Sequence, residues 1–422
     1  MPRRRAELPV MTTIAITDPG ILPDDLPPDL EIAGLSLIDR IARMCLVSGV
    51  STVVIVSDAR WSASFLSDAL SSATRRRGEV HIVDSEQVSE LLRDLKPGCV
   101  LALPADRVFQ RAVVQRAVER CKAGRSGEQL GLAEHQLYGI ASSSVRDWKS
   151  DWSALRGATP SSSDARTTEG WSLRLSSPAD IARAEDALFN DCRKPQDGVV
   201  SRYLNRHLSL SMSRALVATP IGPNHISVVT FSLGIAAALA AGVGGYAAFL
   251  VAGILYQLNS VIDGVDGELA RVRYEFSVLG EWLDTVSDDL SDLLLYIGLG
   301  VGAWRTLDFG LATPGPDIWL YLGLAAGAGK LASMIVYYRW LIARGRGDLL
   351  AFEWSFKAEE ASPSPLKRAL ALLHYAFRKD FIVFVAMLMA IGGVLPYLLV
   401  VLAPGNVIVA ISVVLQQLRG QR

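Results

Sequence analysis

Long apolar runs fill the second half of the chain, where they alternate with polar connections. Six of these runs resemble membrane helices, which need about 20 apolar residues to cross about 30 Å of hydrocarbon. They cover residues 225–243, 246–265, 277–303, 317–343, 381–394 and 396–415. We therefore predict an α-helical polytopic membrane region with about six transmembrane helices. The fifth run is short and joins the sixth through Leu395-Pro396, so hydropathy also allows five or seven.

The first half of the chain alternates short β-branched strands with amphipathic helices. Strands are predicted over 13–16, 52–57 and 100–103, and helices over 36–47 and 108–121. This alternation is typical of an α/β layer with a mostly parallel sheet. The following stretch, 124–170, is rich in Ser, Gly and Thr, and we expect it to be mostly loop.

Two further helices are predicted between these halves. One runs from about Ser177 to Asn190, and the other covers 199–216, where apolar residues alternate with arginines. A basic amphipathic helix directly before a membrane domain usually lies among the lipid headgroups. A soluble linker helix is the alternative. We expect a disordered N-terminus (1–12), an α/β domain (13–175), a linker with an interfacial helix (176–222) and a membrane domain (223–418).

The composition agrees with a membrane protein. Half of the residues are hydrophobic, 20% are charged and the mean hydropathy is +0.29, which is too apolar for an ordinary soluble enzyme of this length. The net charge is −1 and basic clusters are short, so no nucleic acid partner is expected. The four cysteines lie far apart without a CxxC pair, and we expect reduced thiols. The polar N-terminus does not predict a cleaved signal peptide.

Charge in the connections predicts the orientation. Basic residues gather between the fourth and fifth runs and in the turn between the second and third, where Arg271 and Arg273 lie. The positive-inside rule then places both termini and the α/β domain in the cytosol.

The second and third apolar runs contain an acidic pattern, Asp263-x2-Asp266-Gly267-x2-Ala270-Arg271-x8-Gly280-x3-Asp284-x3-Asp288. An aspartate inside an apolar span is costly unless it is paired or hydrated. Helical spacing puts the first two aspartates on one face and the last two on another. Two antiparallel helices joined near Tyr274 therefore direct four carboxylates into one cavity.

Clustered carboxylates are ligands for hard cations such as Mg²⁺ or Mn²⁺. Two such ions can bridge a diphosphate and neutralise the charge that develops during in-line displacement. Gly267, Ala270 and Gly280 lie one turn from the aspartates and leave space for a flat nucleotide. The sequence thus predicts a metal-dependent phosphotransferase.

Two other interpretations explain buried aspartates. They can be satisfied polar residues of a bundle in which Gly and Ala serve close packing. They can also form the cation path of a non-catalytic transporter or channel. A cation path does not require nucleotide-sized space beside the carboxylates, and the two halves show no internal repeat. We therefore favour the enzyme.

The acidic pattern resembles the signature of the CDP-alcohol phosphatidyltransferase family without a gap or substitution. The preceding motifs, KPxDGxxSRxxNRxxS at 194–209 and TPIxPNxIS at 219–227, resemble the entry segment of the branch that contains di-myo-inositol-phosphate-phosphate synthases. This resemblance implies a dimeric six-helix membrane fold in a bacterial or archaeal cell membrane. It also implies that an acceptor hydroxyl attacks the β-phosphorus of a CDP-alcohol and expels CMP.

The resemblance further implies residue roles. Asp263, Asp266 and Asp284 would hold two Mg²⁺ or Mn²⁺ ions, and Asp288 would complete the site and act as the general base. The CDP moiety would contact Pro223, Asn224, Asp263, Gly267, Ala270, Arg271 and Gly280. An acceptor that carries phosphate needs further cations, for which the candidates are Arg202, Arg206, Arg339 and Arg378. The donor would be CDP-diacylglycerol or a CDP-inositol-like molecule, and the acceptor a polar alcohol.

The α/β domain is similar in layout to a sugar-phosphate nucleotidyltransferase, which bifunctional relatives carry in this position. An active member needs a glycine-rich, basic loop after the first strand to hold a triphosphate. Residues 17–25 read TDPGILPDD here, which is acidic and contains proline. Asp106 matches the usual metal-binding aspartate. We expect a degenerate domain that has lost cytidylyltransferase activity.

Overall fold

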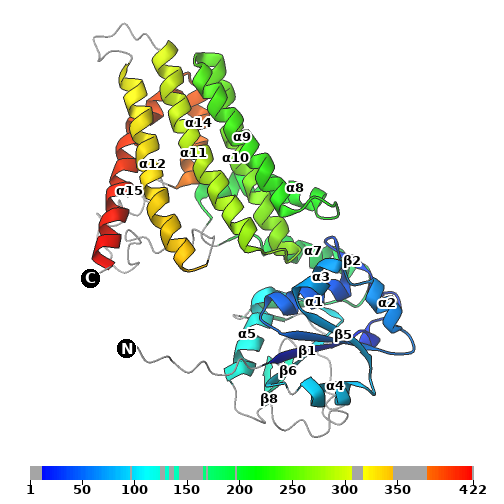
Figure 1. Ribbon diagram of the computed structural model, residues 1–422. Helices are drawn as coiled ribbons and strands as arrows, with labels where there is room; N and C mark the ends of the chain where they lie inside the picture. The colour runs from blue at the N-terminus through cyan, green and yellow to red at the C-terminus, as the bar shows by residue number, and fades with distance from the viewer. Residues whose placement is uncertain are drawn as a thin grey trace, which may run out of the picture. The chain divides into compact units, whose positions relative to one another are not determined.

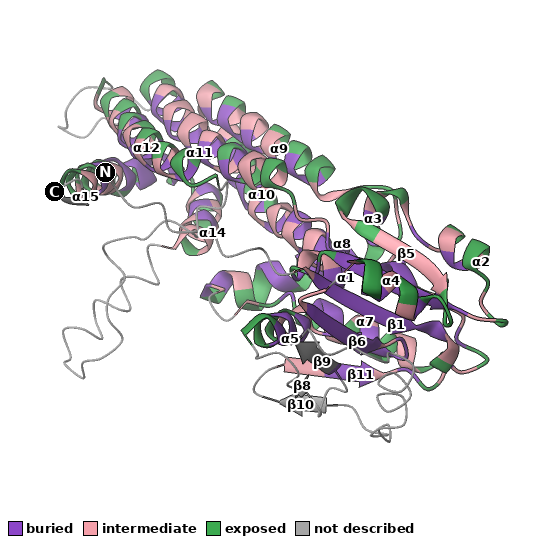
Figure 2. Ribbon diagram, turned by 60° about the horizontal axis from the view of Figure 1, so that its bottom comes forward, coloured by how far each residue is buried: buried purple, intermediate pink, exposed green. Residues whose placement is uncertain are grey.

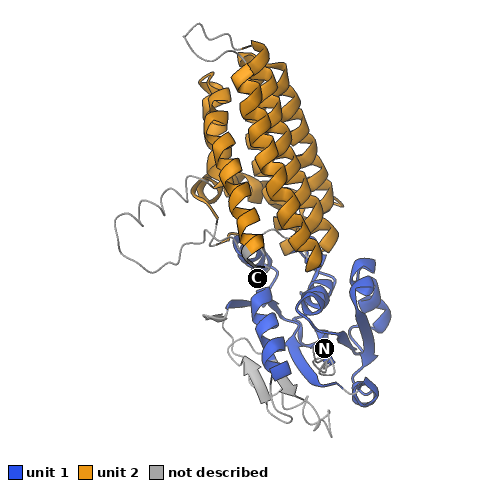
Figure 3. Cartoon of the chain, turned by 60° about the vertical axis from the view of Figure 1, so that its left-hand side comes forward, with its two compact units in different colours: residues 1–192, 272–274 blue, residues 193–271, 275–422 orange. Residues whose placement is uncertain are grey.

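The computed structural model describes residues 12–95, 97–123, 129–132, 137–141, 165–167, 170–194, 197–306, 317–345 and 378–420. The chain divides into two compact units, residues 1–192 with 272–274 and residues 193–271 with 275–422 (Figure 3). The segment 1–12, for which disorder is predicted, lies outside the described residues except for Thr12. Most of the basic connection between the fourth and fifth apolar runs also lies outside them.

The first unit is an α/β domain built on a six-stranded sheet with the strand order β5-β4-β1-β6-β9-β8 (Figure 1). These strands are β1 (Thr13–Asp18), β4 (Thr52–Ser57), β5 (Glu79–Asp84), β6 (Cys99–Pro104), β8 (Gln129–Leu132) and β9 (Leu137–Ala141). The first four strands in this order pair in parallel, whereas β9 pairs antiparallel with β6 and β8. The predicted α/β layer with a mostly parallel sheet is confirmed.

Helices cover both faces of this sheet, which explains why its central strands are continuous apolar runs rather than alternating ones. Ile14 and Val54 face α4 (Val88–Leu95) across a shared core. Cys99 precedes Val100, the partner of Ile14 on β6, so its side chain points to the opposite face of the sheet. There it faces α5 (Arg111–Ala123). Figure 2 shows β1 and β6 buried along their length.

The remaining elements of this unit are short. They are β2 (Glu31–Ile32), β3 (Leu35–Ser36), α1 (Leu37–Val47), α2 (Ala63–Asp68), α3 (Ser72–Arg77), β7 (Arg107–Phe109), β10 (Ala165–Thr167), β11 (Gly170–Arg174) and α7 (Asp180–Asn190). Helix α1 begins where Ser36 Oγ accepts a hydrogen bond from the Asp39 amide at 3.2 Å. Two predictions need correction. The helix expected from residue 108 begins at Arg111, because β7 precedes it, and the loop expected over 124–170 contains β8, β9 and β10.

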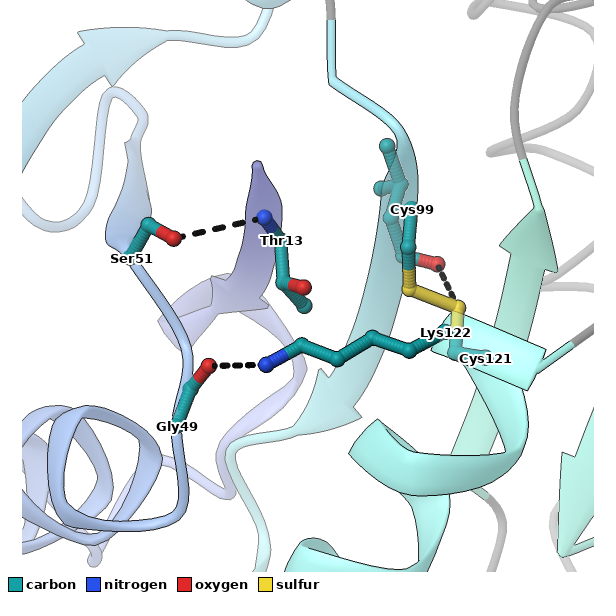
Figure 4. The surroundings of a disulfide bond; sticks show 7 residues. Thr13, Gly49, Ser51, Cys99, Cys121 and Lys122 are labelled. Atoms are coloured by element: carbon teal, nitrogen blue, oxygen red, sulfur yellow. Dashed lines mark hydrogen bonds between the residues drawn. A yellow bond between two sulfur atoms is a disulfide. The ribbon is translucent and has the colours of Figure 1, made fainter. Parts of the chain in front are cut away.

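Cys99 and Cys121 form a disulfide, so the prediction of four reduced thiols was wrong (Figure 4). The crossover helix α5 returns over β6 and brings the two Cα atoms to 5.9 Å, although 22 residues separate them in sequence. Beside it, Lys122 Nζ donates to the Gly49 carbonyl at 2.9 Å. Cys45 and Cys192 are free and buried.

The second unit is a helix bundle. Its helices are α8 (Arg206–Leu216), α9 (Pro223–Val243), α10 (Tyr246–Val272), α11 (Val278–Thr306), α12 (Asp317–Ala343), α14 (Lys379–Ile391) and α15 (Leu398–Gly420). A π-helical turn, Ser201–Asn205, precedes α8. Proline at the first position of α9 and positive φ angles at Gly244 and Gly245 set the start of α9 and its turn into α10.

Small residues let the long helices approach closely. Helices α9, α11, α12 and α15 lie side by side in Figure 1. Gly300 of α11 and Gly323 of α12 face each other, and a Cβ atom on Gly300 would lie 2.8 Å from the Gly323 Cα atom. Close backbone contact through glycine is the packing mode expected in an apolar medium.

Helices occupy all six predicted apolar runs, but four of the described helices are both long and apolar enough to cross a membrane. These are α9, α10, α12 and the segment Leu395–Leu418. The 29-residue α11 carries the acidic pattern, and α14 has 13 residues, which span about 20 Å. An integral membrane region is therefore supported, and the count of six stays a prediction.

The disulfide predicts a specific labelling pattern. In SDS without reductant, a maleimide-polymer reagent should add two tags to the chain, and after reduction it should add four. Without denaturant we expect no tag, because both free thiols are buried and burial raises the pKa of the Cys45 thiol to about 12. Cys99→Ser should add three tags in SDS without reductant, whereas four tags on the unreduced wild type would contradict the bond.

Candidate active site

Helices α10 and α11 bring three predicted metal ligands together. Oxygen atoms of Asp263, Asp266 and Asp284 all lie within 4.8 Å of one another. Asp288 follows Asp284 by one helical turn on α11 and lines the adjoining cavity. Hard carboxylate oxygens at this density fit a divalent cation. The antiparallel arrangement expected from the spacing is therefore the one that the helices adopt.

Helix α9 orients this cluster. Ser227 Oγ donates to Asp266 Oδ2 at 2.7 Å, and the Gly267 amide donates to the other oxygen of the same carboxylate. Asp266 is 7% exposed, so these two hydrogen bonds fix its rotamer. Ser227 was not predicted as a site residue, although it closes the motif that precedes the acidic pattern.

A cavity of about 750 Å³ adjoins the carboxylates. Of the seven residues predicted to contact the CDP moiety, every one except Asp263 lines this cavity. These six are Pro223, Asn224, Gly267, Ala270, Arg271 and Gly280. Asp266, Asp284 and Asp288 line it too. Asp263 joins the carboxylate cluster without being part of the lining.

The small residues of the pattern leave space in the cavity wall. A Cβ atom on Gly280 would lie 3.1 Å from Asn224 Oδ1 and 3.0 Å from Ser277 Oγ. A Cβ atom on Gly267 would lie 3.1 Å from Arg271 Nη1. Larger side chains at these positions would push the neighbouring groups toward the space that a nucleotide would need.

Further charged residues extend the site beyond the acidic pattern. Lys379 Nζ lies 2.8 Å from Asp288 Oδ2 and 3.6 Å from Asp292 Oδ1. Lys330 Nζ lies 2.8 Å from Asp289 Oδ1 and 3.2 Å from Asp292 Oδ2. All five residues line the cavity. The sequence showed Lys330 and the aspartates inside apolar runs and Lys379 just before the fifth run, but it did not show that they meet.

The four arginines considered for an acceptor phosphate are not among the residues that line this cavity in the described part of the chain. Arg202 and Arg339 are exposed, and Arg378 Nε lies 3.6 Å from Asp380 Oδ1. Arg206 is buried and binds both Asp197, at 2.9 Å, and Glu268, at 2.7 Å.

The pairing of Arg206 with Glu268 attaches α8 to α10. The fully buried Glu268 also accepts hydrogen bonds from Ser209 and Ser213, each at 2.6 Å. The polar face of the predicted amphipathic helix is thus turned inward. On its other side, Tyr203 is 71% exposed and Leu208 is 50% exposed. Buried ion pairs of this kind need such additional hydrogen bonds to offset desolvation.

Residues 221–415 match the sequence model of the CDP-alcohol phosphatidyltransferase family. The C-terminal part of the chain is therefore a CDP-alcohol phosphatidyltransferase domain. This agrees with the resemblance found in the acidic pattern.

Individual relatives show the same likeness. The chain is 39% identical over 170 residues to a Thermococcus kodakarensis protein named bifunctional IPC transferase and DIPP synthase, covering 40% of this chain and 35% of that protein. It is 32% identical over 230 residues to a Rubrobacter xylanophilus protein of the same name, covering 54% and 46%. It is 28% identical over 95 residues to an archaetidylinositol phosphate synthase of Pyrococcus horikoshii, covering 22% and 47%. The chain thus spans less than half the length of these relatives.

The hydrogen bond from Ser227 generates a prediction about metal affinity. Ser227→Ala should weaken Mn²⁺ binding by about 10- to 100-fold, because groups that orient a metal-binding carboxylate contribute that much to affinity. Binding can be followed by the electron paramagnetic resonance signal of free Mn²⁺. Ser232→Ala is the matched control, since Ser232 lies exposed on the same helix and its hydroxyl donates to the Val228 carbonyl. Equal Mn²⁺ affinity in the two variants would contradict this role.

Proposed function

We propose that the protein is a membrane CDP-alcohol phosphotransferase. The observation that carries this proposal is the meeting of three carboxylates within 4.8 Å, beside a cavity lined by Gly267, Ala270 and Gly280. Carboxylates alone would also suit a cation path, but a cation path does not explain nucleotide-sized space next to them. The family match over residues 221–415 supports the same reaction class.

In this proposal the donor is a CDP-alcohol whose cytidine lies along the small residues of α10 and α11. Asp263, Asp266 and Asp284 would hold two Mg²⁺ or Mn²⁺ ions, with Asp288 completing the site. Bound divalent cations would neutralise the diphosphate and the charge that develops on it. The acceptor oxygen forms a bond to the β-phosphorus, and the bond from that phosphorus to the CMP oxygen breaks. CMP leaves and a phosphodiester remains.

Asp288 is the candidate base for the proton of the acceptor hydroxyl. It lines the cavity one helical turn from Asp284, and its carboxylate is held by the Lys379 ammonium at 2.8 Å. Part of its effect would be orientation of the hydroxyl. The names of the relatives favour inositol-phosphodiester synthesis as the physiological reaction.

We infer a bacterial or archaeal cell membrane location with six crossings, and with the α/β domain and C-terminus in the cytosol. The acidic α11 would be the third crossing and the short α14 the fifth. The exposed apolar side chains of Tyr203, in the π-helical turn, and Leu208, in α8, support an interfacial position for these two consecutive segments. A homodimer remains part of this proposal by family resemblance.

We also infer that the α/β domain is a degenerate nucleotidyltransferase. Arg60, which follows β4, donates to the carbonyls of Leu22 and Pro23 in the loop after β1 and pairs with Asp24 of that loop at 3.0 Å, so this arginine is already engaged by the loop. Asp106, the candidate metal ligand, is 5% exposed and pairs with Arg174 at 2.9 Å. Both contacts oppose the binding of a metal-triphosphate complex.

The phosphotransferase proposal is tested by CMP release. Purified protein with Mg²⁺, CDP-diacylglycerol or CDP-inositol, and a panel of alcohols should release CMP with at least one pair. Asp288→Asn should lower kcat by about 10²- to 10⁴-fold, the usual contribution of a general base. Absence of CMP from every pair, for the wild type as for Asp288→Asn, would refute the enzyme.

The degenerate domain has a separate test. The full chain mixed with CTP, inositol 1-phosphate and Mg²⁺ should release pyrophosphate no faster than the Asp106→Asn variant, because the loop after β1 lacks a free cation for the triphosphate. A pyrophosphate rate that depends on Asp106 would show that the domain is an active cytidylyltransferase.

A further inference from the structure

The helix that leads into α8 has no capping side chain of its own. It begins at Val199, passes through the π-helical turn and follows Gly198, which has no side chain. The first amides of a helix lack partners within that helix. Here Asp380 of α14 supplies one, because its Oδ2 atom accepts a hydrogen bond from the Ser201 amide at 2.9 Å. A carboxylate 179 residues further along the chain than Ser201 therefore caps this helix.

Gly198 leaves the space that this carboxylate occupies. A Cβ atom on Gly198 would lie 2.5 Å from the Asp380 Cγ atom and closer still to both carboxylate oxygens. Gly198 is buried and the Asp380 side chain is only 13% exposed, so the carboxylate has little room to move aside. The glycine that ends the KPxDG part of the entry motif thus makes room for a side chain of α14.

The same segment is fixed to α10. Asp197, next to Gly198, accepts hydrogen bonds from two nitrogens of Arg206, at 2.9 and 3.0 Å. The third nitrogen of this guanidinium donates to Glu268 of α10 at 2.7 Å. Bidentate pairs between a guanidinium and a carboxylate hold a defined geometry. Residues 197–206 therefore connect α10 with the start of α14.

The start of α14 carries Lys379, the neighbour of Asp380. The Lys379 Nζ atom lies 2.8 Å from Asp288 Oδ2 and 3.6 Å from Asp292 Oδ1. Lysine has a flexible four-carbon side chain, so its ammonium keeps one position only where the backbone is held. Arg378, at the N-cap position of α14, makes no capping hydrogen bond with its side chain. The bond that Asp380 accepts therefore anchors this end of the helix.

We propose that Asp380 is a positioning residue for the phosphotransferase reaction. Held by the Ser201 amide in the space that Gly198 leaves, Asp380 fixes the start of α14 and thereby places the Lys379 ammonium against Asp288. This inference rests on the proposed function, in which Asp288 is the candidate base. The entry motif then contributes to the reaction from outside the cavity, by fixing one helix of the bundle.

The first test needs no turnover. A carbodiimide joins the carboxylate and the amine of an ion pair, and peptide mass spectrometry measures the yield. On the full chain in detergent, we expect a Lys379–Asp288 cross-link in the wild type. Asp380→Ala should give about 10-fold less of it, the effect of losing a hydrogen bond to a charged group. Gly198→Ala should lower the yield as well, but it should add nothing to Asp380→Ala, because its methyl group then has room.

An internal reference separates this effect from unfolding. Lys330 and Asp289, which pair at 2.8 Å, should give their own cross-link with equal yield in all of these variants. Asp317→Ala is the matched control and should leave both yields unchanged. Asp317 is likewise an acidic residue in the first turn of a helix, α12, and accepts a hydrogen bond from Trp304 at 3.0 Å.

The second test is CMP release. Asp380→Ala should lower kcat by about 10- to 100-fold, since a small displacement of a group in the site has that effect, while the KM for the CDP-alcohol and the Mn²⁺ affinity stay constant. Asp380→Asn should retain more activity, because its amide oxygen still accepts from Ser201. In a Lys379→Gln background, Asp380→Ala should lower kcat no further.

An unchanged Lys379–Asp288 yield in Asp380→Ala would overturn the positioning role. So would absence of this cross-link from a wild type that forms the Lys330–Asp289 product, loss of both products together, or additive effects of Asp380→Ala and Lys379→Gln on kcat. If CMP is never released, the proposed function fails, and the cross-link yields still decide whether Asp380 places Lys379.

Discussion

The cost of placing carboxylates inside an apolar bundle governs the whole second unit. Buried charges are retained where they are paired and hydrogen-bonded. Asp288, Asp289 and Asp292 meet that condition through Lys330 and Lys379, and Glu268 meets it through Arg206 and two serines. The cluster of Asp263, Asp266 and Asp284 concentrates negative charge beside a cavity, which is the condition that a divalent cation would satisfy.

Helix packing and chemistry use the same small residues. Glycine contacts such as the one between Gly300 and Gly323 bring the helices close together, so that short side chains can reach across from one helix to the next. Ser227 reaches Asp266 in this way. Gly267 and Gly280 instead leave room in the cavity wall. The two interpretations of these glycines, close packing and nucleotide space, thus apply to different positions in the same bundle.

Much of this arrangement could be predicted, because the acidic pattern is local: helical spacing alone predicts which aspartates share a face. Lys330 and Lys379 were visible as charges, but their pairing depends on how α12 and α14 pack on α11, which spacing does not encode. Strand β5 was missed although its first residues alternate between polar and apolar, which is a strand pattern, and the antiparallel β8 and β9 were taken for loop. The disulfide was missed because Cys99 and Cys121 meet only through the crossover of α5.

The proposed reaction depends above all on a metal site formed by Asp263, Asp266 and Asp284. Crystals of the full chain soaked in Mn²⁺ would test it through anomalous scattering. We expect manganese peaks within coordination distance of oxygens from all three carboxylates, and loss of those peaks in an Asp266→Asn variant. Peaks confined to other acidic residues, or none at millimolar Mn²⁺, would contradict it.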